Sequence, residues 1–366
     1  MFHGRVVGQL SLTPDDRLNV FVYDKSWLGD GFSISPLELP LKSGVFIAKP
    51  HPFYGNFGIF EDSLPDGYGR YLLHKALLRN GIDDSDLSSL DRLALVGANG
   101  MGALTYFPSI NLEHEETVTD FDRLQEMALQ VLKEQQDKDA GLLLYNSGNS
   151  GGARPKAIFS DAEGHWIVKF RHTYDPKDVG IMEARYNEIA RKSGIIVPDF
   201  RLVNGRYFAS RRFDIDNDGH RIHTATAGGL MCISIREPFM DYSNLLALTG
   251  FITQNREDVE QMYRRMLFNY LTDNKDDHCK NFSFYVVRNA DSNTWRWRLA
   301  PAYDLTLSSE GYNGEHATSV NGTGHPRLYD FIAVGAKIKL TEDRCREIIE
   351  EVSSACSELT RYHLRE

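Results

Sequence analysis

Residues 274–284, NKDDHCKNFSF, crowd acidic, basic and amide side chains beside an apolar, strand-like run. Within this segment Asp276 is followed five positions later by Asn281. In phosphoryl transfer, a loop with this D-x-x-x-x-N spacing places a carboxylate beside the attacking hydroxyl and an amide oxygen on a metal ion. The spacing therefore predicts a catalytic loop. Because Asp and Asn are common in loops, an ordinary solvated loop is the alternative interpretation.

A second metal-binding carboxylate is expected near the same phosphates, at the end of a strand that fixes its backbone. The segment WRWRLAPAYDL places Asp304 directly after an aromatic-rich apolar run. Asp304 is therefore predicted as the second metal ligand. A turn with a capping Asp is the alternative.

A cation for the phosphates is predicted at Lys169, in the strand-like segment WIVKF. An unpaired ammonium between apolar neighbours would be costly, so Lys169 needs an anionic partner. Glu183, in the following helical region, is the candidate, by analogy with the ion pair that positions the kinase lysine. A lysine on the exposed face of a half-buried strand is the alternative.

The segment GNSGGARPK contains glycines that would let backbone N–H groups approach a phosphate, and Lys156 adds a positive charge. It matches neither the Walker A pattern nor the kinase G-x-G-x-x-G pattern. A simple tight turn at Gly151 and Gly152 is the alternative.

The elements that must position these residues follow from the apolar periodicity. Alternation over residues 5–41 predicts strands, and helical spacing follows at 66–78 and 83–97. Further helices are predicted at 121–132 behind a cap at Thr119 or Asp120, at 183–192, at 255–270 behind Asn255, and at 345–359. Between them, AIFS, WIVKFRH and FRLVNGRYFASRRFD have strand character. The predicted domains are 1–108, 109–236 and 237–366.

Composition narrows the function classes. The chain has 366 residues and a formal charge of -10, which disfavours a broad nucleic-acid surface. Its four cysteines show no zinc-ligand spacing, and reduced thiols in a cytoplasmic protein are expected. No signal peptide or run of about 20 apolar residues is present. The sequence contains no G-x-S-x-G nucleophile elbow, so it does not indicate a Ser-His-Asp hydrolase. Cys345 and Cys356 fall on an apolar helical stripe and are expected in the core.

Taken in order, several segments resemble the HipA family of bacterial toxin kinases. The segments are FVYDKSWL, ISPLELPL, FEDSLPDGYGR, GANGMGAL, SGGARPK, WIVKF, RRFD, DDHCKNFSF and APAYDL. The resemblance implies an α+β, divergent two-lobed protein-kinase-like fold. It would have an extra N-terminal α+β subdomain (1–108), an N-lobe with the Gly-rich loop (109–236), and a mostly helical C-lobe with the catalytic loop and metal site (237–366).

The resemblance also implies roles for individual residues with ATP and Mg²⁺ as cofactors. Asp276 would be the base, assisted by Lys169, while Asn281 and Asp304 would hold magnesium. The implied nucleotide contacts are Gly151, Gly152, Ala153, Arg154, Pro155, Lys156, Lys169, His278, Lys280 and Tyr303, with Arg211, Arg212 and Phe213 at the adenine hinge. Where the family often carries a phosphorylatable serine, this chain has Asn149, so Ser147 and Ser150 are the candidates for autophosphorylation.

The implied activity is a Ser/Thr protein kinase that slows growth, with a protein substrate such as an aminoacyl-tRNA synthetase. The implied partner is a HipB-like helix-turn-helix antitoxin, through which the chain would meet DNA only indirectly; no membrane partner is expected. Two alternatives stay open. One is a small-molecule phosphotransferase, which the N-terminal module of residues 1–108 disfavours. The other is a nucleotide-binding pseudokinase that acts as a corepressor.

Overall fold

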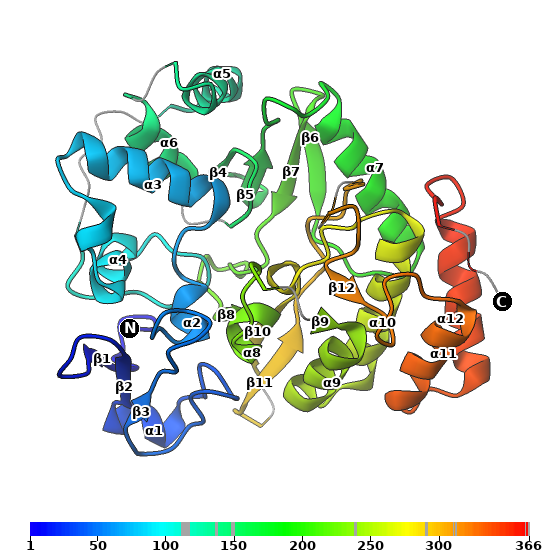
Figure 1. The fold of residues 1–366 in the computed structure, drawn as a ribbon, viewed down its shortest axis with the longest axis horizontal. Coiled ribbons are helices and arrows are strands. Elements are labelled where there is room, and N and C mark those ends of the chain that lie inside the picture. The colour runs from blue at the N-terminus through cyan, green and yellow to red at the C-terminus, as the bar shows by residue number, and fades with distance from the viewer. Residues whose placement is uncertain are drawn as a thin grey trace. The chain divides into compact units, whose positions relative to one another are not determined.

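Figure 1 shows the computed structural model, which describes residues 1–110, 118–135, 138–147, 151–237, 240–289, 292–309, 311, 313–362 and 364. The chain forms two compact units. The first comprises Met1–Ile181 and Asp199–Thr224, and the second comprises Met182–Pro198 and Ala225–Glu366. Helices and strands are mixed along the chain, which confirms the predicted α+β class. The three-part domain division stays a prediction.

The first unit begins with a three-stranded antiparallel sheet in the order β1-β2-β3, where β1 is Gly8–Leu12, β2 Asn19–Tyr23 and β3 Phe46–Ile47. Strand β2 buries Phe21 and Tyr23 and turns Val22 outward, as period-2 alternation requires. Strands β1 and β2 confirm the strands predicted in residues 5–41, but Lys25–Asp30 form helix α1, which the prediction lacked. The Asp24 carboxylate caps this helix by accepting the Ser26 N–H at 2.8 Å.

Short helices follow the sheet. They are α2 (Gly58–Glu61), α3 (Gly67–Arg79), the 3₁₀ turn η1 (Asp84–Asp86) and α4 (Ser89–Val96). The helix predicted at 66–78 is confirmed by α3. The one predicted at 83–97 is divided, since Ser88 starts α4 with its own capping box to Asp91. Residues 111–117, just after the predicted domain boundary at 108, lie outside the described residues.

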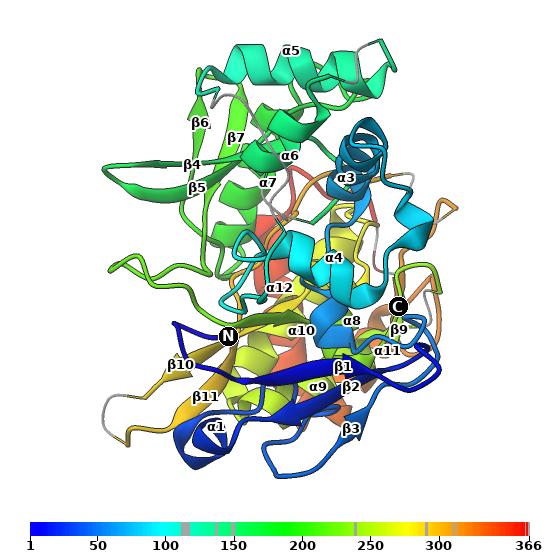
Figure 2. The ribbon, with the colours of Figure 1, turned by 90° about the vertical axis from the view of Figure 1, so that its left-hand side faces the viewer.

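A four-stranded antiparallel sheet, in the order β4-β5-β7-β6, completes the first unit. Its strands are β4 (Lys156–Asp161), β5 (Gly164–Lys169), β6 (Phe200–Val203) and β7 (Tyr207–Arg211). Helices α5 (Phe121–Leu132) and α6 (Ala140–Ser147) lie against it, as Figure 2 shows. Trp166 and Val168 of β5 share a buried core with Leu72 of α3. The Asp120 side chain caps α5, one of the two predicted positions.

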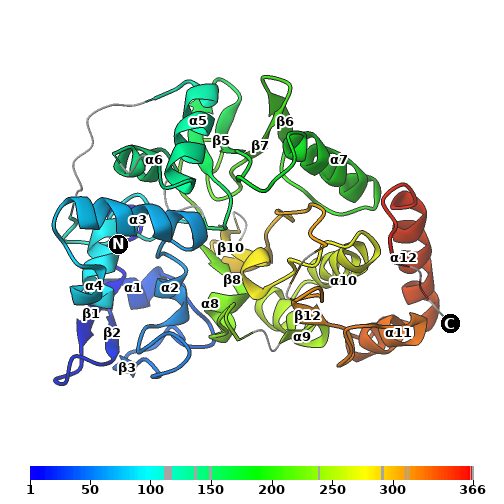
Figure 3. The same cartoon turned by 45° about the horizontal axis from the view of Figure 1, so that its top comes forward.

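Helix α7 (Val179–Lys192) starts in the first unit and continues into the second. The second unit is mainly helical, and Figure 3 shows α9 (Tyr242–Thr253), α10 (Arg256–Leu271), α11 (Leu328–Lys337) and α12 (Glu342–Ala355) gathered in it. Helix α10 is central, because Met262, Met266 and Tyr270 are all fully buried. Asn255 caps α10 as predicted, accepting the Asp258 N–H at 3.1 Å.

Smaller elements of the second unit carry the loops of interest. Strands β8 (Thr224–Thr226), β10 (Ser283–Arg288) and β11 (Trp295–Leu299) form a sheet in the order β11-β10-β8, and β9 (Met240–Asp241) pairs with β12 (Thr318–Ser319). Helix α8 is Ala227–Met231 and the 3₁₀ turn η2 is Cys279–Asn281. Cys345 and Cys356 are fully buried, which confirms their predicted place in the core. Among the described residues, no helix has the length and apolar character to cross a bilayer.

Candidate active site

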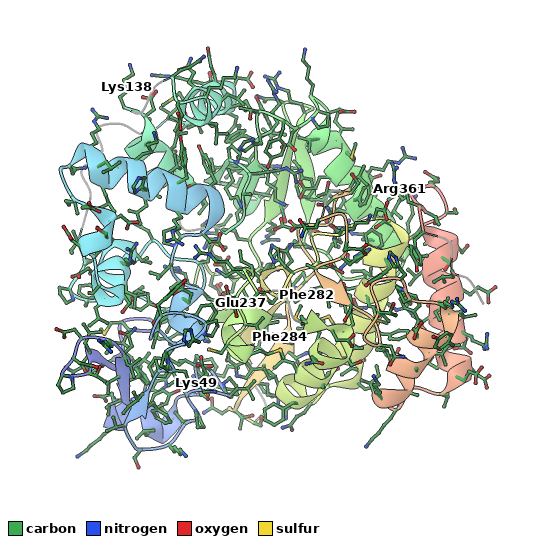
Figure 4. The ribbon with its side chains drawn as sticks, in the orientation of Figure 1. Lys49, Lys138, Glu237, Phe282, Phe284 and Arg361 are labelled. Atoms are coloured by element: carbon green, nitrogen blue, oxygen red, sulfur yellow. The ribbon has the colours of Figure 1, made fainter. Side chains whose placement is uncertain are left out.

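The predicted catalytic loop connects α10 to β10 in the second unit. At its two ends, the Asn281 Nδ2 donates a hydrogen bond of 2.6 Å to the Asp276 carbonyl. The Asp276 carboxylate is 58% exposed and its Oδ1 lies 3.6 Å from His278 Nε2. The loop then enters β10 between buried Phe282 and Phe284, which Figure 4 labels. The five-residue spacing thus brings Asp276 and Asn281 together in one turn, and the buried residues Phe282 and Phe284 follow it.

The neighbouring acid, Asp277, is buried and has a different role. Its Oδ2 accepts the Tyr242 hydroxyl at 2.8 Å and lies 3.0 Å from His316 Nδ1, while its Oδ1 accepts the Ala317 N–H at 2.9 Å. Burial, followed by the Asp277 charge, raises the pKa of Tyr242 well above its ordinary value, so its hydroxyl stays a donor. Asp277 therefore anchors the loop to α9 and to residues 316–318.

Asp304 lies on a segment that runs beside this loop. Asn274 forms an isolated parallel β-bridge with Ser308, and the Ser308 N–H donates to the Asp273 carbonyl at 3.1 Å. The buried Asn274 side chain donates to Asn269 Oδ1 at 2.9 Å and to the Asp304 carbonyl at 3.4 Å. Asp304 has a φ of +54°, which is uncommon for a non-glycine residue. The second unit thus holds Asp276, Asn281 and Asp304 on two directly bonded segments.

Tyr303 and His278 help to shape the loop. The Tyr303 hydroxyl donates to the Lys280 carbonyl at 2.6 Å and lies 2.6 Å from Ser283 Oγ. His278 Nδ1 accepts the Lys280 N–H at 3.2 Å and so caps η2. These contacts give both side chains a structural role beside any contact with a nucleotide.

The glycine-rich loop belongs to the first unit. Gly152, with a φ of +101°, donates its N–H to Asp66 Oδ1 at 2.7 Å and accepts the Tyr68 N–H at 3.0 Å. The Lys156 ammonium donates to the Gly151 carbonyl. Arg154 forms a two-pronged ion pair with Asp175, at 2.9 and 3.1 Å. The Arg154 guanidinium is therefore already paired with a carboxylate. The loop would bind a phosphate through its backbone N–H groups.

Lys169 ends strand β5, opposite Lys156 in the antiparallel pair. Its Nζ lies 5.6 Å from the centroid of the Phe208 ring. It also lines a pocket of about 330 Å³, together with Gln125, Arg171, Lys177 and Arg206 among others. Two lysines on adjacent strands suit an anion. Glu183 is buried on α7 but belongs to the other unit, so its ion pair with Lys169 stays a prediction.

Two family models match this chain. The HipA N-terminal domain matches residues 1–107, and the HipA-like C-terminal domain matches residues 148–359, which is more than half of the chain.

The chain belongs to the HipA family.

One relative and one solved structure match most of this HipA-family chain, and a second relative matches a third of it. Y4dM of Sinorhizobium fredii, a proposed kinase, is 26% identical over 385 aligned positions, covering 95% of this chain and 88% of the relative. A proposed kinase of Haemophilus influenzae is 29% identical over 33% of this chain and 39% of its own length. A chain of the Shewanella oneidensis MR-1 complex of HipA, HipB and operator DNA has a TM-score of 0.69 at 18% identity, covering 96% of this chain and 88% of that chain. The fold is therefore HipA-like and related to kinases.

The hinge residues predicted from the HipA resemblance are largely bound within the first unit. Arg212 pairs through two bonds, at 2.9 and 2.7 Å, with the buried Asp214. Burial opposes the charged form of Asp214, but the Arg212 bonds keep its pKa below the ordinary value. The N–H groups of Arg211 and Arg212 donate to the Asp199 and His165 carbonyls. Because these N–H groups are already bonded, an adenine ring at the hinge would have to contact backbone carbonyl groups of residues 211–213 or the Phe213 side chain.

The serine candidates differ in what the structure says of them. Ser147 is buried at the end of α6, and its hydroxyl donates to the Leu144 carbonyl at 3.0 Å. Phosphorylation of Ser147 would require this helix end to open. Ser150 and Asn149 lie outside the described residues. Autophosphorylation of either serine stays a prediction.

Sequence reasoning missed the residues that hold the HipA-type loops in place. Tyr242, Asn269, Asn274 and Asp277 form one chain of side-chain hydrogen bonds under the catalytic loop. Asn274 is buried in the structure and so needs partners for its amide, but its burial could not be read from the sequence. Asp66 was quoted only as part of a motif, and its contact with a residue 86 positions later left no local signal.

Proposed function

We propose that this HipA-family chain is an ATP- and magnesium-dependent Ser/Thr protein kinase that acts as the toxin of a toxin–antitoxin pair. The observation that carries the proposal is the second unit's arrangement, in which Asn281 bonds to Asp276 and Asn274 bonds to the Asp304 segment. A base and two oxygen ligands are what phosphoryl transfer needs from one loop region. The kinase names of the relatives support the same chemistry.

The side chains present fit a magnesium ion. Magnesium prefers oxygen ligands from carboxylates and carbonyls. The bond from Asn281 Nδ2 to the Asp276 carbonyl orients the carboxamide, so that Oδ1 is the atom left to face a cation. Asn281 and Asp304 would hold the ion, which supplies positive charge at the phosphates. The exposed Asp276 carboxylate would accept the proton of the attacking hydroxyl while the buried Asp277 holds the loop still.

Lys156, Lys169 and the backbone of residues 151–154 would contact the phosphates. The substrate would be a protein hydroxyl, with an aminoacyl-tRNA synthetase as the candidate from the family resemblance. The net charge of -10 supports a chain that reaches DNA only through a basic partner.

A labelling experiment tests the activity. The purified chain is incubated with γ-labelled ATP, magnesium and whole-cell lysate, and a dominant labelled protein is expected. Asp276→Asn and Asp304→Ala should each lower labelling by about 10²- to 10⁴-fold. Asp343→Asn, at an exposed acid in the first turn of α12, is the control and should label normally. Labelling at the wild-type level by both site variants would contradict the proposal. ADP release with small alcohols and no labelled protein would indicate a small-molecule phosphotransferase instead.

The antitoxin is tested separately. The Shewanella HipA structure contains HipB and operator DNA, and we propose an equivalent helix-turn-helix partner for this chain. A short helix-turn-helix protein encoded beside this gene should co-elute with the chain and be needed for it to shift operator DNA. A shift of DNA by the chain alone at 150 mM salt would contradict the proposed indirect contact.

A further inference from the structure

The segment 66–68, which begins α3, holds the glycine-rich loop by its backbone. We propose that Asp66 is a positioning residue for nucleotide binding, and that with Gly67 and Tyr68 it sets the conformation of the loop 151–156. This inference rests on the proposed function, because it takes the loop to be the phosphate-binding element. It adds that the N-terminal segment determines how well ATP binds.

Both polar backbone groups of Gly152 are bonded to this segment. The Gly152 N–H donates to Asp66 Oδ1 at 2.7 Å, and the Gly152 carbonyl accepts the Tyr68 N–H at 3.0 Å. A hydrogen bond to a carboxylate is shorter and stronger than one between neutral groups. The peptide groups before and after the Gly152 Cα are therefore each bonded to a residue more than 80 positions earlier in the sequence.

Gly67 allows the two backbones to approach this closely. A Cβ built on Gly67 would lie 2.4 Å from the Gly152 carbonyl oxygen, a distance at which backbone must move. Gly67 also has a φ of +45°, a conformation that favours glycine. A side chain at residue 67 would push the glycine-rich loop away, and no flexible side-chain end is there to yield.

The other end of the loop is held independently. Arg154 is bonded to the buried Asp175 carboxylate at 2.9 and 3.1 Å, and the Phe170 N–H donates to the Pro155 carbonyl at 2.8 Å. Residues 155 and 156 are thus fixed by the β4–β5 pairing whatever happens at Asp66. Loss of the Asp66 bond should release residues 151–153 and leave the sheet intact.

A phosphate-binding loop that is ordered beforehand binds with less entropic cost than one that must be ordered by the ligand. Asp66 would act on the free protein and the ATP complex, not on the reacting atoms. We therefore expect its loss to change affinity for ATP and leave the chemical step nearly unchanged.

The test uses the full chain with Asp66→Ala, Asp66→Asn and Gly67→Ala. Asp83→Ala is the control for the acid, because the Asp83 carboxylate also accepts a backbone N–H, that of Ser85, at 2.8 Å. Gly81→Ala is the control for the glycine, because Gly81 has a φ of +72° with nothing within 4 Å of an added Cβ. The measurements are the Kd and KM for MgATP, kcat, and hydrogen exchange of residues 151–156 without nucleotide.

We expect Asp66→Ala and Gly67→Ala to raise Kd and KM about tenfold, with kcat within about twofold. Exchange at the Gly152 amide should accelerate at least about tenfold. Asp66→Asn should recover most of the affinity, since its Oδ1 can still accept the Gly152 N–H, and both controls should match the wild type.

Two outcomes would overturn the inference. Unchanged affinity in Asp66→Ala and Gly67→Ala would show that the contact does not position the loop for ATP. Tighter binding in Asp66→Ala would show that the carboxylate competes with a phosphate for the Gly152 amide. Wild-type protein that binds no MgATP would instead overturn the proposed function, and the exchange measurement would still report whether Asp66 orders the loop.

Discussion

The adjacent residues Asp276 and Asp277 show that the surroundings of a carboxylate decide whether it is exposed to solvent or bonded within the protein. Asp276 is 58% exposed beside His278, whereas Asp277 is buried and accepts bonds from Tyr242 and the Ala317 backbone. A carboxylate that reacts must reach a substrate, while one that anchors must have its acceptors filled. The two residues are chemically identical, and their surroundings suit them to different roles.

The first prediction contrasts them. Asp277→Ala removes the acceptor for the Tyr242 hydroxyl and a backbone N–H in a buried site, so it should lower the free energy of unfolding by about 3 kcal/mol or more. Asp276→Ala should lower it by less than about 0.5 kcal/mol, because the side chain is exposed. Urea unfolding of both variants measures the difference, and similar losses would contradict the assigned roles.

A second prediction concerns pH and belongs to His223 in the first unit. Burial lowers the pKa of His223 to about 4 from an ordinary value of 6.5, although its bond to the Ile34 carbonyl at 2.9 Å opposes this. Between about pH 4 and pH 6.5, His223 is therefore protonated in the unfolded chain and neutral in the folded chain. Stability from His223 is complete above about pH 6.5 and falls as the pH drops toward 4, by on the order of 3 kcal/mol.

His223→Gln tests this pH dependence, because Gln keeps an N–H donor for the Ile34 carbonyl and cannot titrate there. Unfolding free energies are measured between pH 7 and pH 4.5 for both proteins. The slope of stability against pH should be smaller in the variant. Parallel curves would mean that His223 is not the group responsible.

At the scale of elements, the second unit depends on close helix packing. Helix α11 meets α12 at Gly335, where an added Cβ would lie 2.2 Å from Cys345 Sγ. Helix α10 contributes Tyr263, whose hydroxyl donates to the Phe331 carbonyl at 2.9 Å. The packing of these helices therefore leaves no room for a larger residue at Gly335.

A third prediction uses two helical glycines of this unit. Gly335→Ala should destabilise by about 1–3 kcal/mol, because overpacking forces a buried cysteine or the backbone to shift. Gly250→Ala in α9 is the matched control, since its added Cβ would make an ordinary 3.6 Å contact with Val259 Cγ2. The control should be neutral or stabilising by up to about 1 kcal/mol, as expected for Gly to Ala in a helix. Thermal unfolding of both distinguishes these outcomes, and equal effects would contradict the packing argument.

At the scale of the whole molecule, the chain passes between the two units more than once. Residues 182–198 belong to the second unit, and residues 199–224 return to the first. The loops proposed to bind one nucleotide lie in different units.

The fourth prediction is a ligand-dependent stability. MgATP at about 100 times its Kd should stabilise the folded chain by about 2.7 kcal/mol. EDTA, or the Asp304→Ala substitution, should remove most of this shift if Asp304 is a metal ligand. Scanning calorimetry with ATP plus magnesium, ATP plus EDTA, and no ligand measures it. A full shift in EDTA would contradict the metal role of Asp304.

The sequence alone determined features that depend on short stretches of chain. Periodicity located α3, α5, α10 and α12, the caps at Asp120 and Asn255 followed from residue type, and the close approach of Asp276 to Asn281 followed from their five-residue spacing. Neighbouring residues have few conformations to choose among, so local patterns are informative. Helix α1 was missed because its 6 residues, less than two turns, are too few to show a period.

Only the tertiary structure decided which of two adjacent acids is buried, and which distant segments touch. Nothing near Asp66 in the sequence indicates Gly152, and nothing near Asn274 indicates Asp304. Such pairs are selected by packing over the whole core, where burying apolar surface outweighs the entropy of closing long loops. Candidates for the reactive groups could therefore be named from the sequence, while the residues that hold them in place could not.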